Sequence, residues 1–308
     1  MKDFTLKAYK SYLEILSKKD FYFSDFRTYL SNENKPSKKI CLVRHDVDRK
    51  PTNALEMAQL EQSMGITSTY YFRTKPATFK KDIIRSISGL GHEIGYHYET
   101  LSDTRGDINK AVEIFSKELD KLRTIVPINT VSMHGRPLLP YDNRDIWRDA
   151  ERHNFLISNL SILGEVYLDI DYSNIAYISD TGRNWTNSKS NKRDKVNSNI
   201  NTNFNTTSDM VSFLNNPTSN TIVFQIHPER WSSNFVDYTC QYLKDSIINV
   251  LKRAVKWLTL DNKKLNKEEY YNKKDRIGTY LSNKRNSVVI PYINGLLIDI
   301  ACGDGQLL

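Results

Sequence analysis

The sequence has little cysteine and no long apolar run. Its three cysteines, Cys41, Cys240 and Cys302, are far apart and odd in number, which excludes a disulfide framework and a zinc-finger spacing. No stretch approaches the roughly 18 apolar residues of a membrane-spanning helix, and charges interrupt the apolar residues of the N-terminus. We therefore expect reduced thiols, no membrane span, no signal peptide and a cytoplasmic protein.

The composition is that of a globular protein with a sizeable core. The 308 residues are 39% apolar and 26% charged, which is too apolar for a disordered chain. The net charge is +8, but residues 261–287 hold eight Lys or Arg against four Asp or Glu, which is half of that excess. Elsewhere no basic stripe is interleaved with aromatic residues, so we expect no nucleic-acid partner.

Strand and helix patterns alternate between residues 38 and 258. Runs rich in β-branched and aromatic residues predict strands at 40–43, 68–72, 93–97, 130–133 and 221–226. Helical spacing predicts helices at 4–16, 52–64, 79–88, 108–123 and 238–258. This alternation predicts an α/β fold with a parallel sheet, and its length favours a closed or nearly closed (β/α) barrel.

Polar clusters follow the predicted strands, at the edge where active sites of α/β barrels assemble. The first is RHDVD at 44–48, in which Asp46 and Asp48 are two residues apart and would point to the same side of an extended strand. One carboxylate can then hold a metal while the other takes a proton. The alternative is that one of them only caps the helix that starts near Thr52.

The second and third clusters contain histidines. GHEIGYHYE at 91–99 contains the candidate ligand His97, with Glu99 beside it, whereas His92 is expected to be structural. SMHGRP at 132–137 forces a turn that presents His134 and Arg136 to the same face. For any single histidine, a hydrogen-bonded place in the core is the commoner alternative to metal binding.

The last two clusters are DTGRNW at 180–185 and IHPERW at 226–231. In the latter, Pro228 ends the strand and leaves His227 at its rim.

In this order, the five clusters resemble the motifs of the NodB-homology polysaccharide deacetylases, a carbohydrate esterase family, over residues 38–258. The resemblance implies a distorted (β/α) barrel of about seven parallel strands. It also implies that Asp46 is the general base, Asp48 and His97 are metal ligands, and His227 is the general acid, oriented by Asp180. The residues of the motifs are most similar to those of the WbmS-type branch, which is associated with O-antigen and other surface-polysaccharide gene clusters.

The second motif departs from the family pattern. The family usually has another histidine four residues after the first, and that position here is Leu101. Either His134 or Glu99 completes the site, or the metal is bound loosely or lost. We favour His134, because a turn fixed by glycine and proline can hold it rigidly and borderline divalent ions accept imidazole. The expected cofactor is a divalent metal, with zinc as the first choice.

Other side chains of the clusters suit substrate binding. Arg136 or Arg183 can hold the base ionised or bind an anionic substrate, with surface ion pairs as the alternative. Glu99 lies beside a ligand and is a further candidate for substrate contact. The rings that suit stacking on sugar faces, with packing at the strand rim as the alternative, are those of Tyr98, Trp185 and Trp231.

The chain divides into three predicted segments: a helical lead-in at 1–37, the barrel at 38–260 and a different segment at 261–308. The last combines a basic linker with GLLIDIACGDG at 295–305, a short strand followed by a glycine-rich turn. This stretch resembles the first motif of the S-adenosylmethionine-dependent methyltransferases. We interpret it as the truncated beginning of a Rossmann-like domain and assign it no activity.

The leading functional hypothesis is a metal-dependent hydrolase that removes N-acetyl groups from an amino sugar or polysaccharide precursor in surface-polysaccharide biosynthesis. Its partner would be a carbohydrate substrate. The alternatives are a catalytically silent carbohydrate-binding barrel that has lost a metal ligand, and a methyltransferase fragment whose barrel is only a partner domain.

Overall fold

The computed structural model describes residues 3–31, 39–136, 139–186 and 193–260. Its centre is a single sheet in which every strand pair is parallel. The strand order is β6-β5-β4-β3-β2-β8-β7, and β1 also pairs with β2. The strands are β1 (Tyr22–Ser24), β2 (Ile40–Val47), β3 (Thr69–Phe72), β4 (Glu93–Tyr98), β5 (Thr130–Met133), β6 (Gly164–Glu165), β7 (Ile175–Ser179) and β8 (Thr221–Ile226).

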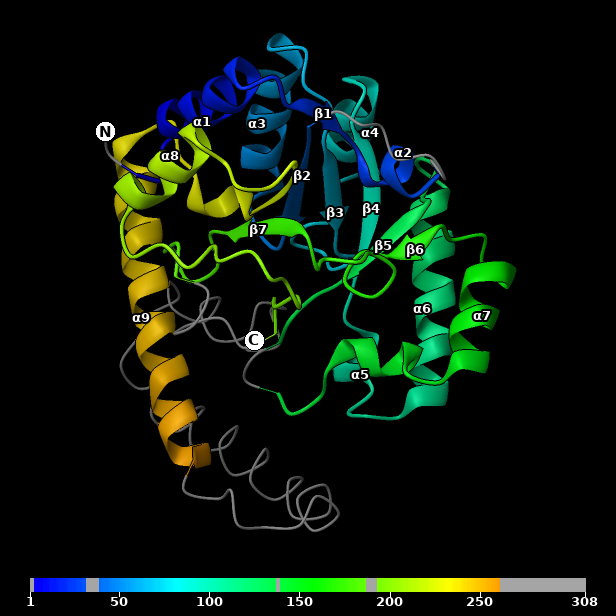
Figure 1. Ribbon diagram of the computed structural model, residues 1–308. Coiled ribbons are helices and arrows are strands. Elements are labelled where there is room, and N and C mark those ends of the chain that lie inside the picture. The colour runs from blue at the N-terminus through cyan, green and yellow to red at the C-terminus, as the bar shows by residue number, and fades with distance from the viewer. Residues whose placement is uncertain (1–2, 32–38, 137–138, 187–192, 261–308) are drawn as a thin grey trace.

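The sheet curls into a half-barrel with helices on its outer side (Figure 1). Strands β6 and β7 form its two edges and do not pair with each other within the described residues. The predicted α/β barrel of parallel strands is thus confirmed in an open form. The helices are α1 (Leu6–Lys18), α2 (Phe26–Ser31), α3 (Pro51–Ser63), α4 (Lys81–Gly89), α5 (Thr100–Asp103), α6 (Ile108–Arg123), α7 (Ala150–Asn159), α8 (Thr207–Asn215) and α9 (Phe235–Leu260), with short 3-10 turns η1 (Asn143–Trp147) and η2 (Pro228–Arg230).

Helix α1 packs into the same core as the strands. Its Tyr9 and Leu13 are fully buried in one apolar cluster with Val43 of β2 and Phe224 of β8. A second apolar cluster lies under α6, where Phe115 and Leu119 are buried. These helices cover the outer face of the sheet, and side chains inside the barrel cover its inner face, which explains why all eight residues of β2 are buried.

The alternation of side chains along β2 separates two buried polar groups. Arg44 and Asp46 point into the barrel. There Arg44 donates to the hydroxyl of Tyr167, and Gln225 donates to Asp46. His45, between them, points to the other face, and its Nε2 lies 2.7 Å from Oε1 of Glu61. Side chains that are neighbours in sequence therefore belong to different networks.

His92 has the structural place expected of it. Its Nδ1 lies 2.9 Å from the Ser68 hydroxyl, and its Nε2 lies 3.0 Å from the carbonyl oxygen of Ala58. The ring is buried. His92 directly precedes β4 and so lies at the opposite end of this strand from His97.

Most predicted elements are present, with shifted ends. The predicted strands at 130–133 and 221–226 and the helix at 108–123 coincide with β5, β8 and α6. Strand β2 extends to Val47, and β7 is a strand that the sequence pattern did not identify. None of the described helices is long and apolar enough to cross a membrane. The predicted segment 261–308, with its methyltransferase-like stretch, lies outside the described residues.

Candidate metal and catalytic site

The predicted polar clusters meet at the carboxyl edge of the sheet. Asp48 follows β2, His97 lies near the end of β4, and His134 follows β5 directly. Asp180 follows β7 and His227 follows β8. Because all these strands are parallel, their carboxyl ends share one edge, and five segments distant in sequence contribute to one site.

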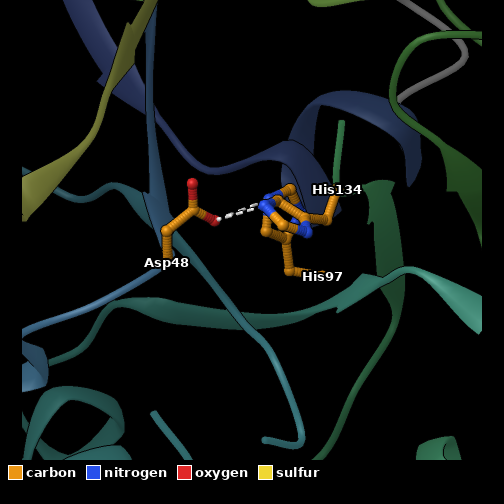
Figure 2. A group of neighbouring side chains, drawn as sticks. All are labelled: Asp48, His97 and His134. Carbon is orange, nitrogen blue, oxygen red and sulfur yellow. Dashed lines mark ion pairs between the residues drawn. The ribbon is translucent and has the colours of Figure 1, made fainter. Parts of the chain in front are cut away.

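Three side chains form a group that can hold a metal ion. Oδ1 of Asp48 lies 3.4 Å from Nε2 of His97 and 3.4 Å from Nε2 of His134. The three ligand atoms all lie within 4.8 Å of one another. Figure 2 shows the carboxylate of Asp48 directed at the two imidazole rings. The predicted set of metal ligands is therefore brought together.

The outer nitrogen of each imidazole is held by an acceptor. Nδ1 of His97 lies 3.0 Å from the carbonyl oxygen of Ser132, and Nδ1 of His134 lies 2.8 Å from Oε2 of Glu99. In the neutral imidazoles that bind a metal, these acceptors favour the proton on Nδ1, which leaves the Nε2 lone pairs free to face the cation. Oδ1 of Asp48 is itself buried and has no hydrogen-bond partner among the described residues. Two imidazoles and one carboxylate so arranged fit a zinc-like cation.

The electrostatics of the group favour positive charge. Burial lowers the pKa of His134, but the charges of Asp48 and Glu99 outweigh burial and raise this pKa to about 9. Burial raises the pKa of Asp48, while His134 and His97 lower it to well below its usual value. The carboxylate is thus ionised at neutral pH, as a metal ligand must be.

Glu99 acts on the site through His134. Sequence analysis favoured His134 over Glu99 as the replacement for the missing histidine, and the structure places Nε2 of His134 in the ligand group. The carboxylate of Glu99 is buried and bonded to Arg73 and His134. This position suits a partner that orients the ligand, and it leaves Glu99 no open face for a substrate.

We expect Glu99→Gln to weaken zinc binding by about 10- to 100-fold, the usual effect of removing a partner of a metal-bound histidine. The amide loses the charge that fixes the tautomer of His134. Calorimetric titration with zinc measures the change. The matched control is Glu113→Gln, because the Glu113 side chain is exposed on α6. Equal affinity of the Glu99 variant and the wild type would contradict this role.

Asp46 is held by a residue that sequence analysis did not assign. Nε and Nη2 of Arg44 each donate to the Asp46 carboxylate at 2.8 Å, and Nε2 of Gln225 donates to it at 2.6 Å. Burial raises the pKa of Asp46, but Arg44 and then His97 lower it to about 2. Oδ2 of Asp46 lies 3.8 Å from Nε2 of His97, so this carboxylate borders the metal group.

Arg136 and Arg183, the two arginines suggested to hold the base ionised or to bind an anionic substrate, have partners other than Asp46. Nη1 of Arg136 donates to Asp103 at 2.9 Å, at the rim of the site. Nη1 of Arg183 lies 3.3 Å from Asp245 of α9, and its guanidinium lies 5.0 Å from the Phe4 ring centroid. Arg183 therefore anchors α9 and the N-terminal segment, through partners that leave no local signal in the sequence.

His227 is fixed by a cluster around Asp180. Nδ1 of His227 lies 2.6 Å from Oδ1 of Asp180, and the backbone amide of His227 donates to Oδ2 at 3.0 Å. Arg230 and Trp231 also donate to this carboxylate, each at 2.8 Å. Burial and then Arg230 lower the pKa of His227, but Asp180 and Asp48 together raise it, and the net shift is upward.

The aromatic rings predicted to stack on sugars are buried. Tyr98 and Trp231 are 0% exposed and Trp185 is 4% exposed. Tyr98 packs on Phe115, and Trp185 stacks on Phe4 with ring centroids 5.4 Å apart. The sugar-stacking prediction for these rings is contradicted, because strand-rim aromatics here complete the core.

Glu229 is a buried acid near His227 in the sequence that sequence analysis did not single out. It lies two residues after His227, is fully buried, and neither of its carboxylate oxygens has a hydrogen-bond partner among the described residues. Burial raises its pKa, and the charge of Asp48 raises it further. The only local signal was an acid within IHPERW, which on its own would also suit an exposed turn.

No protein-family model and no curated protein sequence matches the chain. Among solved structures, the chain is similar to a family 4 carbohydrate esterase from Bacillus anthracis, with 10% identity and a TM-score of 0.33 over 80% of this chain and 86% of that chain. It is also similar to a CE4 esterase from Streptococcus mutans, with 12% identity and a TM-score of 0.41 over 77% of this chain and 88% of that chain. Likeness at this distance does not identify a reaction or a substrate.

Proposed function

We propose that this chain is a metal-dependent hydrolase that removes N-acetyl groups from an amino sugar or polysaccharide precursor. The observation that carries the proposal is the ligand group of Asp48, His97 and His134, with its three ligand atoms within 4.8 Å of one another. A carboxylate, Asp46, and an imidazole on an aspartate, His227, flank that group at the same strand edge.

Hydrolysis of an amide needs a polarised carbonyl, an activated water and a proton for the departing amine. A divalent cation held by Asp48, His97 and His134 would act as a Lewis acid and lower the pKa of bound water. A set of two imidazole nitrogens and one carboxylate oxygen supports zinc as the cation.

Asp46 is the proposed proton acceptor. Its low pKa keeps the carboxylate ionised over the neutral range, and Arg44 and Gln225 hold it in one orientation. A general base must reach the water that it deprotonates. The contact of Oδ2 with His97 at 3.8 Å supports this placement.

His227 is the proposed proton donor. Asp180 holds Nδ1, which leaves Nε2 as the atom that would protonate the leaving amine. The upward shift of its pKa makes the protonated form more accessible than in a free histidine, as a proton donor requires. Asp180 would act as the positioning residue for this acid.

The proposed substrate class is supported by the sequence motifs. HDVD, GHEIGYHYE, MHGRP and HPERW resemble the branch of deacetylases linked to surface-polysaccharide gene clusters. A nucleotide-linked or lipid-linked precursor and a finished polymer are both N-acetylated carbohydrates, and assays with each would separate them.

The silent-barrel alternative was based on Leu101. This residue is 3% exposed and lies in the apolar core, while His134 brings a second imidazole from another strand end. The absence of histidine at position 101 therefore does not argue against a cation site.

We expect the purified chain to contain one zinc and to release acetate from N-acetylated sugars. Chelation should abolish acetate release, and added zinc should restore it, because the cation supplies the Lewis acid. Elemental analysis and an acetate assay on nucleotide-linked and polymeric N-acetyl sugars test this. A chain without metal that releases no acetate but binds carbohydrate would favour the silent barrel.

A further inference from the structure

Three buried carboxylate oxygens have no hydrogen-bond partner in the described part of the chain. They are Oδ1 of Asp48 and both oxygens of Glu229. The other buried acids have donors: Glu61 accepts from Tyr70 and Ser68, and Glu93 accepts from Thr69 and Thr130. Burying a carboxylate without partners opposes folding. Oδ1 of Asp48 still faces two imidazoles at 3.4 Å, whereas no donor of the described residues lies within hydrogen-bond distance of either oxygen of Glu229. The exception at Glu229 therefore calls for a ligand.

The position of Glu229 connects it with the cation site. Turn η2, which carries Glu229, packs against β2 and α3 and directly follows His227. The charge of Asp48 is the second cause, after burial, of the raised pKa of Glu229, so the two carboxylates repel each other. Arg49 does not remove this repulsion, because its Nη2 comes only to within 3.9 Å of Oε1 of Glu229.

A divalent cation relieves this repulsion better than a neutral hydrogen-bond donor does. As ligands, His97 and His134 are neutral. Asp48 and Glu229 then supply two negative charges, which match the charge of the ion. A sugar hydroxyl would satisfy one oxygen of Glu229 and leave the charges unbalanced.

We propose that Glu229 is a fourth member of the cation site, whose carboxylate accepts hydrogen bonds from water carried by a divalent ion held by Asp48, His97 and His134. This inference rests on the cation of the proposed function and assigns it an additional, outer carboxylate. Outer groups of this kind set the affinity of a metal site. Glu229 is therefore a positioning residue and need not contact substrate.

We expect Glu229→Gln to weaken zinc binding by about 10-fold or more without lowering the melting temperature of the chelator-treated protein. The glutamine has the same shape and lacks the unpaired charge, so the protein without zinc should be as stable as the wild type or more stable. Zinc should then raise the melting temperature of the variant less than that of the wild type. Calorimetric titration with zinc chloride and thermal unfolding of the full chain measure both effects.

The matched control is Glu93→Gln. Glu93 is equally buried and also has a raised pKa, about 7, caused first by burial, but it begins β4 at the opposite end of the strand from His97. Its variant should keep the zinc affinity and lose stability, because three donors lose their charged acceptor.

Glu229→Asp retains the charge and provides a second variant. It should bind zinc more tightly than Glu229→Gln does. The proposal is overturned if both Glu229 variants bind zinc like the wild type, if Glu229→Gln only destabilises the protein, or if the wild type binds no zinc. Zinc binding without acetate release would instead refute only the proposed reaction, and the affinities would still decide the role of Glu229.

Discussion

Asp48→Asn is expected to eliminate zinc binding and, with it, acetate release. Asp48 is the only anionic member of the ligand group, and its Oδ1 lies 3.4 Å from both imidazole Nε2 atoms. Loss of Lewis-acid stabilisation worth several kcal/mol corresponds to a rate loss of about 10³-fold or more. Elemental analysis of the purified variant and the acetate assay measure the two losses.

The control for this substitution is Asp82→Asn, since the Asp82 side chain is fully exposed on α4. That variant should keep both the zinc content and the rate. Retention of zinc by Asp48→Asn, in a protein with an unchanged circular dichroism spectrum, would place the cation elsewhere and remove the basis of the proposed mechanism.

His227→Ala is expected to slow acetate release by about 10²- to 10⁴-fold, the usual contribution of a positioned general acid. An amine is a poor leaving group until it is protonated, and no other imidazole is held on Asp180. Zinc content should stay at the wild-type level because His227 is not part of the ligand group. The Asp48 and His227 variants therefore differ mainly in metal content.

The pH dependence gives an independent readout for His227. Its pKa in the folded protein lies above the ordinary value of 6.5, and the proposed role needs the protonated form. Activity should therefore fall as pH rises through this raised pKa. In His227→Ala the fall should disappear from the residual activity.

His153→Ala is the matched control. Nε2 of His153 lies 2.9 Å from Oδ1 of Asp169, so it is also a histidine paired with an aspartate, but on α7, away from the site. This variant should keep the rate and the pH profile. Near-wild-type activity of His227→Ala would show that another group protonates the amine.

The order of elements and the approximate place of the site could be predicted from sequence alone. Periodicity along the chain is a local property, so the patterns at 108–123, 130–133 and 221–226 were sufficient to locate α6, β5 and β8. Parallel strands share one carboxyl edge, so polar residues that follow them were predicted to converge. The convergence of Asp48, His97 and His134 follows from these two facts.

The partners of those residues depended on the tertiary structure. Arg44 and Gln225 are register partners on β2 and β8, and this pairing brings both donors to Asp46. Because β2 and β8 are far apart in the sequence, their register leaves no local pattern. This explains why Arg136 and Arg183, and not Arg44, were considered as partners of the base. Strand register also pairs His97 with Ser132, which lies two residues before His134.

Strand alternation and helical spacing are properties of consecutive residues, so they are enough to predict which residue types follow each strand. Which of these residues are exposed, paired or without a partner depends on contacts between distant segments. Trp185 and Trp231 became core residues because the N-terminal segment covers them with Phe4. Glu229 became a candidate for the cation site because packing of η2 on β2 buries it without a hydrogen-bond donor from the described residues, and the side chain of Arg49, the residue after Asp48, comes within 3.9 Å of it. Burial and pairing are properties of contacts between distant segments, and those contacts exist only in the folded chain.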